Sequence, residues 1–212
     1  DRNGLLTKRD LSNYEVGFEK TIFEKFGDYY IHKTDIWGQG LTSLMMMKLC
    51  EKKKVKQLDN EESIHKFVES LKLTFADREM YFSGQQNPKV KAKHLLDNDY
   101  LSKRSRLITD KAIESIIPGD PLNHKTLLPL DNEIKPWGAG TVHISIIDKE
   151  NNAISCTPSG GWIRSNEVVK DLGFPLGNRL MTFYLSKPGH VNFISPSQQP
   201  RTTLSPTLII NK

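Results

Sequence analysis

The sequence is poor in the residues that build several common kinds of site. It has only two cysteines, Cys50 and Cys156, and no Cys-x-x-Cys pair, which excludes a disulfide framework and a cysteine-based zinc site. Its six histidines are scattered without ligand spacing, and no glycine-rich loop suited to phosphate is present. We therefore predict no metal site and no cofactor, and we expect Cys156 to be a small buried residue.

Long apolar runs and concentrated charge are also missing. The longest apolar run, around residues 44–47, is far too short to span a membrane. The net charge of +5 comes from scattered basic residues that aromatic residues do not accompany, so nucleic acid is not a predicted partner. The chain starts at Asp1 with neither an initiating Met nor a signal segment, which indicates a piece of a longer protein and leaves its localisation open.

The first part of the chain has mainly helical patterns. We expect helices over 7–14, 41–50, 63–82, 100–108 and 111–116, and two strands near 19–23 and 29–34. We expect polar residues of the longest helix, among them Asp77 and Arg78, to lie on a solvent-exposed face. The alternative is that Asp77 or Arg78 is paired with an oppositely charged residue inside a larger protein. The same helix has apolar residues at helical spacing, and they predict the stripe that faces the core: Ile64, Phe67, Val68, Leu71 and Phe75.

The second part of the chain has β patterns, and a proline- and glycine-containing loop over 120–140 leads into it. Apolar and polar residues alternate over 141–147, a polar turn follows, and 153–157 reads as the returning strand. These segments predict a β-hairpin that begins at Thr141.

The dipeptide Gly140-Thr141 at the start of this hairpin has a chemical interpretation. Cleavage before Thr141 would free an α-amine beside its hydroxyl, and that amine could act as the general base for the hydroxyl. The alternative is an ordinary strand that happens to begin with threonine. The residues downstream favour the first interpretation.

Several stretches, in register along nearly the whole chain, resemble the γ-glutamyltranspeptidase family of N-terminal-nucleophile hydrolases. TVH at 141–143, followed by DK at 148–149 and NA at 152–153, resembles the nucleophile hairpin of that family. PRTTLSPT at 200–207 is similar to its later hydroxyl-rich segment. Upstream, the turn at Gln39-Gly40 and the stretch from His65 to Arg78 resemble the end of its large subunit.

The resemblance implies an α+β fold of four αββα layers, mostly helical before the nucleophile and β-rich after it. It implies a precursor cut between Gly140 and Thr141 into two subunits that stay together. Residues 1–140 would end the large-subunit region, and residues 141–212 would begin the small one. The substrate-binding arginine and the oxyanion-hole glycine pair of the family would lie outside this chain. Each missing oxyanion donor costs about 10²–10³ in rate, so we expect this piece alone to be inactive.

The resemblance also assigns roles to single residues. Thr141 matches the nucleophile, and Ser159 lies where the family has a threonine hydroxyl bonded to the nucleophile. Thr202 and Thr203 match a pair of serines that hold the α-carboxylate of a γ-glutamyl group. Arg201, beside them, could add charge to this carboxylate site.

Two positions depart from the family pattern. Where the family has an amide and an aspartate that bind the substrate's α-amino group, this chain has Arg179 and Thr182. An arginine repels an ammonium, and threonine carries no negative charge to attract one. The sequence therefore leaves three hypotheses: an amide hydrolase or acyltransferase for γ-glutamyl or related carboxylated amides, the same chemistry on a dicarboxylic monoamide or β-lactam acyl group, and a non-catalytic, uncleaved relative.

Overall fold

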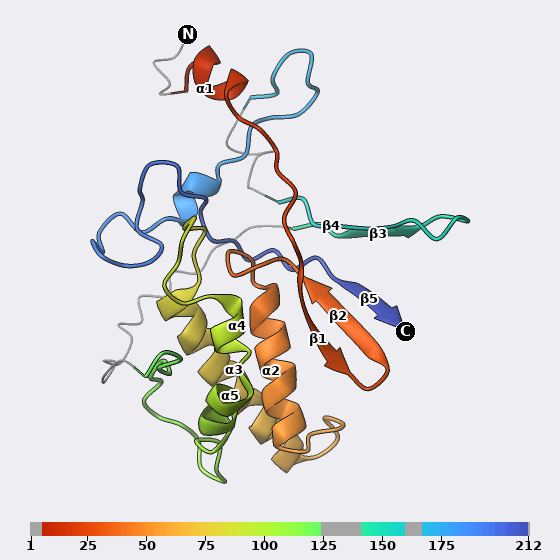
Figure 1. Cartoon of the computed structure of the whole chain (residues 1–212), viewed down its shortest axis with the longest axis vertical. Coiled ribbons are helices and arrows are strands. Elements are labelled where there is room, and N and C mark those ends of the chain that lie inside the picture. The colour runs from red at the N-terminus through yellow and green to blue at the C-terminus, as the bar shows by residue number, and fades with distance from the viewer. Residues whose placement is uncertain (1–5, 124–140, 160–166, 212) are drawn as a thin grey trace.

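The computed structural model describes residues 6–123, 141–159 and 167–211, so Gly140 and most of the preceding loop lie outside the described residues. Four helices gather on one side of the molecule, and strands extend from the other (Figure 1). The helical elements are α1 (Lys8–Ser12), α2 (Gly40–Lys52), α3 (Glu61–Tyr81), α4 (Ala92–Leu95), α5 (Asn98–Ser105) and the 3₁₀ turn η1 (Arg179–Thr182). The strands are β1 (Ile22–Phe26), β2 (Tyr29–Lys33), β3 (Ile144–Ile147), β4 (Ala153–Cys156) and β5 (Leu208–Asn211).

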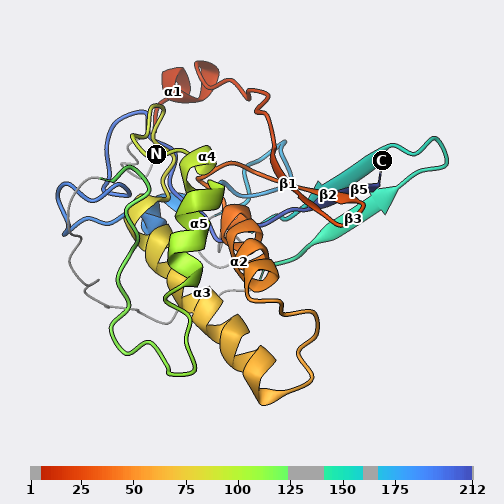
Figure 2. The same ribbon diagram turned by 60° about the horizontal axis from the view of Figure 1, so that its bottom comes forward.

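The hydrophobic core lies within the helical layer. α2 packs on both α3 and α5, and α3 runs obliquely past these two helices (Figure 2). Leu41, Met45 and Leu49 of α2 are at most 1% exposed, so Met45 fills the core beside the two leucines. The other main contributors come from α3, α5 and the adjoining segments: Leu73, Phe82, Leu95, Leu101 and Ile108.

The predicted inward face of α3 is wrong. Ile64, Val68 and Phe75 are 48%, 41% and 43% exposed, whereas Leu73 and Ala76 are buried. The inward face of α3 also carries polar residues, including Glu69 and Asp77, which are 1% exposed and have charged partners. Polar side chains of a helix can be buried when their partners satisfy them, so the apolar stripe alone did not identify the packed face.

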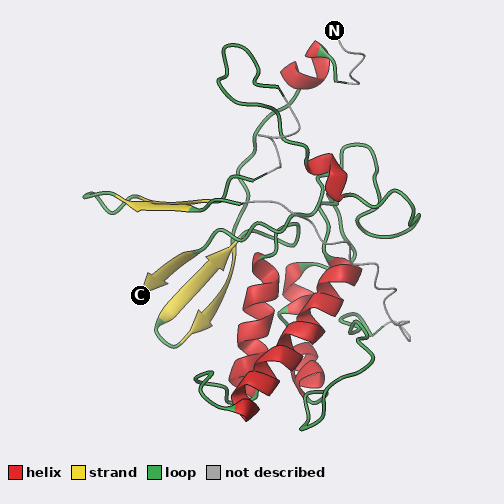
Figure 3. Cartoon of the chain, turned by 180° about the vertical axis from the view of Figure 1, so that it is seen from behind, coloured by secondary structure: helices red, strands yellow, loops and turns green. Residues whose placement is uncertain are grey.

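The main sheet has three strands in the order β1-β2-β5, all antiparallel. β1 and β2 form a hairpin whose turn uses Gly27 at a φ of +58°, a conformation that favours glycine. β5 comes from the region after Thr141 and pairs with β2, as the view from behind shows (Figure 3). The chain is thus α+β, and its main sheet combines strands from both predicted regions.

Other predictions differ from the structure locally. Residues 111–116 form no helix; instead the Ile113 backbone is held against α3, where its N–H donates to Glu69 at 2.8 Å and its carbonyl accepts from Lys72 at 3.2 Å. These tertiary bonds replace the helical ones. Cys156 is exposed rather than buried, whereas Cys50 is buried in α2.

Candidate active site

The hairpin β3–β4 positions Thr141 and Ser159. Its turn is closed by Asp148, whose Oδ1 accepts from the backbone N–H groups of Glu150 at 2.9 Å and Asn152 at 2.8 Å. The strands begin at Ile144, three residues later than predicted, but Val142 N–H still donates to the carbonyl of Pro158 at 3.4 Å. Pairing therefore continues towards the open end of the hairpin.

At this open end the two predicted catalytic hydroxyls meet. Thr141 Oγ1 and Ser159 Oγ lie 2.9 Å apart, within hydrogen-bond distance, and either can be the donor. The structure thus brings together the two residues that are 18 positions apart in the sequence. A hydroxyl at this distance can donate to the oxygen of a neighbouring nucleophile.

A histidine next to this pair has contacts that the sequence did not predict. His143 Nδ1 lies 2.7 Å from Thr157 Oγ1, and its Nε2 lies 2.9 Å from Ser145 Oγ. The polar face of the hairpin thus carries a connected set of hydroxyls with an imidazole between them. Strand alternation already placed Thr141, His143 and Ser145 on one face, but it did not indicate the bond from His143 to Thr157 on the opposite arm.

The second group of predicted site residues lies on the segment before β5. Thr202 is 7% exposed; its N–H donates to the Trp37 carbonyl at 2.8 Å, and its Oγ1 accepts from Leu204 N–H at 2.8 Å. Thr203, by contrast, is exposed. The two matched hydroxyls therefore differ: one is held within the fold and the other faces outwards.

Arg201 points into the fold towards α3. It is 7% exposed, and its Nη2 lies 2.5 Å from Glu79 Oε2 and 2.9 Å from the Tyr184 hydroxyl. Burial alone would raise the pKa of Glu79, but the positive charge of Arg201 and the hydrogen bond from Tyr184 lower it below its ordinary value. The guanidinium of Arg201 is thus engaged by an internal carboxylate.

A buried asparagine connects η1 to the segment that carries Arg201. Asn192 is 0% exposed; its Oδ1 accepts from Arg201 N–H at 3.1 Å and its Nδ2 donates to the Thr182 carbonyl at 2.7 Å. The Thr182 hydroxyl donates to the carbonyls of Arg179 at 2.8 Å and Arg201 at 3.1 Å. Thr182, Arg201 and Thr202 therefore form one connected unit, which the sequence spacing did not reveal.

Arg179 begins η1 and is partly buried. Its Nη2 is buried and has no hydrogen-bond partner among the described residues. Burial lowers the pKa of its guanidinium below the ordinary value, as expected for a cation removed from water without a carboxylate beside it. Such a donor fits an acceptor that is supplied from outside the described chain.

The hydroxyl pair of the hairpin, Thr141 and Ser159, is connected to the segment that carries Thr202 and Thr203 through the residue just before β5. Thr207 N–H donates to Ser155 Oγ of β4 at 2.9 Å, and β4 and β5 lie side by side. This bond ties the β3–β4 hairpin to the hydroxyl-rich segment at 200–207.

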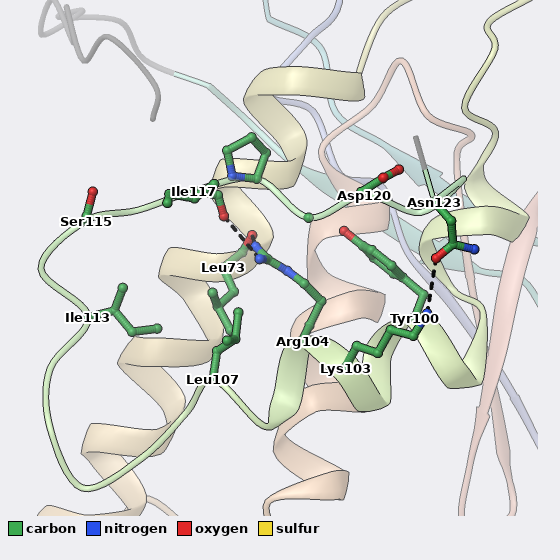
Figure 4. A pocket seen from close by; sticks show the side chains of 12 residues that line it. Leu73, Tyr100, Lys103, Arg104, Leu107, Ile113, Ser115, Ile117, Asp120 and Asn123 are labelled. Atoms are coloured by element: carbon green, nitrogen blue, oxygen red, sulfur yellow. Dashed lines mark hydrogen bonds between the residues drawn. The ribbon is translucent and has the colours of Figure 1, made fainter. Parts of the chain in front are cut away.

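A separate cavity of about 580 Å³ lies between α3, α5 and the segment after α5 (Figure 4). Arg104 lies along its wall, with Nη1 donating to the Ile117 carbonyl at 3.1 Å. Among the described residues, none of the predicted catalytic or substrate-binding residues lines this cavity. It is therefore distinct from the hairpin site.

A charged cluster in the wall of this cavity anchors the segment that leads towards Thr141. Asp77 accepts from the Tyr100 hydroxyl at 2.7 Å and from Gly119 N–H at 2.7 Å, and Arg104 Nη2 lies 3.0 Å from its Oδ1. Burial and the neighbouring Asp77 carboxylate raise the pKa of Tyr100 above its ordinary value, so its hydroxyl keeps its proton. Asp77 is thus paired and buried, as in the second of the two sequence-based alternatives.

Comparison with known proteins adds to this geometry. A family profile described as Gamma-glutamyltranspeptidase matches residues 1–212. The chain belongs to the γ-glutamyltranspeptidase family. The match agrees with the resemblance of the nucleophile hairpin and the hydroxyl-rich segment to this family.

Named members of the γ-glutamyltranspeptidase family and related structures differ in what they act on. A glutathione hydrolase proenzyme from Bacillus subtilis (strain 168) is 27% identical over 99% of this chain and 37% of its own length. An oxamate amidohydrolase proenzyme from Klebsiella pneumoniae subsp. pneumoniae is 28% identical over 79% of this chain and 29% of its own. The fold matches a cephalosporin acylase from Bacillus halodurans with a TM-score of 0.79 and 24% identity, over 98% of this chain and 35% of that one.

The chain therefore spans 37% and 29% of the lengths of these two curated relatives. Within its described part, no helix is both long enough and apolar enough to cross a membrane. The same described ranges contain no cluster of three or more His, Cys, Asp or Glu residues that could hold a metal ion.

Proposed function

We propose that the protein containing this chain is an N-terminal-nucleophile amide hydrolase or acyltransferase, made as a precursor that cuts itself between Gly140 and Thr141. The observation that carries this proposal is the 2.9 Å distance between the hydroxyls of Thr141 and Ser159 at the open end of the hairpin. The proenzyme names of the relatives support a precursor. Residues 1–140 would belong to the large subunit and residues 141–212 to the small one.

In the proposed reaction Thr141 Oγ1 attacks the acyl carbon of the amide, and the freed α-amine of Thr141 takes the hydroxyl proton. Ser159 donates a hydrogen bond to the attacking oxygen. The C–N bond of the amide then breaks, and the departing amine leaves with the proton. Water, or a second amine, attacks the resulting acyl ester and regenerates the Thr141 hydroxyl.

The proposed acyl group carries a carboxylate. Thr202 and Thr203 would present hydroxyls to it, as the family pattern implies, and Arg179 has a buried Nη2 without a partner among the described residues. An arginine at this position favours an acyl group that has a carboxylate and lacks an ammonium. The substrate class is thus γ-glutamyl or related carboxylated amides, with a dicarboxylic monoamide or β-lactam acyl group as the second candidate favoured by Arg179.

The proposal includes an overall architecture of four αββα layers, made from both subunits. The pairing of β5 with β2 supports two subunits that stay together, because the main sheet needs strands from both. The full precursor would supply the remaining substrate and oxyanion donors.

Mass spectrometry of the purified full-length protein tests the cleavage. We expect two fragments, the second beginning at Thr141, and we expect Thr141→Ala to abolish both cleavage and turnover of amide substrates. Thr141→Ser, which keeps a hydroxyl and an α-amine, is the matched control and should retain cleavage. A precursor that stays intact under all conditions would instead support the third hypothesis, a non-catalytic relative.

Glutathione, γ-glutamyl anilide and glutaryl anilide then separate the substrate candidates. Efficient turnover of the two γ-glutamyl compounds would contradict the second candidate. Faster turnover of the glutaryl compound, which lacks the α-ammonium, is the result that the position of Arg179 predicts.

A further inference from the structure

Lys33, at the end of β2, is a buried cation that the proposed reaction does not yet use. Lys33 is 7% exposed, yet it forms no salt bridge among the described residues. Nζ donates instead to Ser205 Oγ at 2.9 Å and Thr207 Oγ1 at 2.5 Å, and lies 3.5 Å from the Ser205 carbonyl. A buried charge that has only neutral partners is costly and is rarely kept without a use.

The stem of Lys33 passes over the start of α2. A Cβ at Gly40 would lie 2.8 Å from Lys33 Cβ, so glycine at this position leaves the room that the lysine side chain takes. The adjoining Gln39 N–H donates to the Leu204 carbonyl at 3.0 Å. Lys33 and the first turn of α2 therefore hold the hydroxyl-rich segment from two sides.

The position of the charge follows from these contacts. Thr203, the exposed member of the hydroxyl pair, is two residues before Ser205, a separation of at most about 7 Å along an extended chain. Adding the two hydroxyl side chains and a hydrogen bond at each end places the ammonium no more than about 17 Å from an anion bound at Thr203. Burial lowers the pKa of Lys33, as desolvation of a cation without an anionic partner does, and a bound anion would favour its charged form.

We propose that Lys33 is a specificity-determining residue of the acyl-group site, where its buried positive charge selects acyl groups that carry a carboxylate. This inference rests on the proposed function and deepens it. Lys33 attracts the carboxylate of the acyl group through its charge, and it positions Ser205 and Thr207 through hydrogen bonds. It does not contact the reacting atoms. Thr207 also bonds to Ser155 of the nucleophile hairpin, so the same contacts hold the carboxylate site and the nucleophile in one register.

The expected size of the effect follows from Coulomb's law. At no more than about 17 Å and an effective dielectric constant of about 20, one unit charge changes the binding of an opposite unit charge by about fivefold or more. The binding of a neutral acyl group should not depend on this charge.

The test uses the processed full-length enzyme and two anilides. One is the γ-glutamyl or glutaryl 4-nitroanilide, whichever the wild type hydrolyses faster, and the other is the same anilide with its carboxylate converted to a carboxamide. We expect Lys33→Gln, which keeps a hydrogen-bond donor without the charge, to lower kcat/KM about fivefold or more for the carboxylate and little for the carboxamide. Lys33→Arg should retain the preference.

Two controls separate charge from structure. Lys25→Gln, on the neighbouring strand β1, makes the same change in net charge at an exposed site and should leave the preference unchanged. Lys33→Met is measured in parallel, so that misfolding of one variant does not decide the result. Because Lys33→Gln and Lys33→Met each remove a desolvated charge, their melting temperatures should stay equal or rise while their preference falls.

An equal loss on both anilides in the Lys33 variants would overturn the proposal and leave a structural role for Lys33. A wild type that does not prefer the carboxylate would overturn it as well. Failure of the proposed function looks different: Thr141→Ala would then match the wild type on both anilides.

Discussion

Replacing Asp77 by asparagine should strongly destabilise the fold. Asp77 and Arg104 have side chains that are 1% and 5% exposed, and their closest atoms lie 3.0 Å apart. In Asp77→Asn the Arg104 guanidinium stays buried without its counter-charge, and the amide NH₂ replaces one of the two oxygens that accept from Tyr100 and Gly119. Breaking a buried pair in this way costs about 3–5 kcal/mol.

Denaturant unfolding of the wild type and the variant measures this cost. The midpoint should fall with little change in slope, because the surface that is exposed on unfolding stays the same. Replacing both partners, as in the double variant Asp77→Asn with Arg104→Met, should recover part of the loss, since no unpaired charge is then left in the interior.

The matched control is the exposed pair Glu62–Lys66 on the same helix. Glu62→Gln should leave the midpoint unchanged within error, because solvent screens this pair. The reasoning is refuted if Asp77→Asn costs no more than Glu62→Gln, or if the double variant is no more stable than Asp77→Asn. Slower processing at Thr141 in Asp77→Asn is a second expected result, because Asp77 holds Gly119 on the path to the cleavage site.

Two further predictions concern the segment that carries Arg201. Asn192→Ala leaves Arg201 N–H and the Thr182 carbonyl without their partners, so the free energy of unfolding should fall by about 2–4 kcal/mol in calorimetry, and kcat/KM should fall with it. Unchanged values of both would contradict the role of Asn192 in connecting η1 to the Arg201 segment. Burial lowers the pKa of His190 in the folded protein, although the Glu79 carboxylate opposes this. As the pH drops below about 6.5, the imidazole therefore binds a proton more readily in the unfolded chain than in the folded one, and the free energy of unfolding falls. His190→Gln should remove this part of the dependence of the melting temperature on pH, and an unaltered curve would show that another group causes it.

Local sequence patterns predicted much of the fold. The helix expected over 7–14 is present as α1, where Thr7 and Asp10 form a capping box. The hairpin at 144–156 followed from alternation and a turn of acidic and amide residues. These features succeed because each depends on hydrogen bonds between residues close in sequence.

Features that depend on distant partners were not predictable in the same way. The apolar stripe of α3 pointed to the wrong face, because Glu69 and Asp77 are buried by partners 44 and 42 positions away. Arg201 was expected at the substrate, but the structure pairs it with Glu79, 122 positions earlier in the chain. No pattern within a short window carries such information.

For the candidate site, the sequence by itself determined which residues have the right chemistry. The hydroxyls of Thr141, Ser159, Thr202 and Thr203 came from motifs in register, and the family match agrees with those motifs. The tertiary structure decided which of these groups meet, because a hydroxyl acts only on what lies within about 3 Å. It paired Thr141 with Ser159, turned Arg201 inwards, and placed beneath the hydroxyl-rich segment a buried Lys33 that no sequence pattern had singled out.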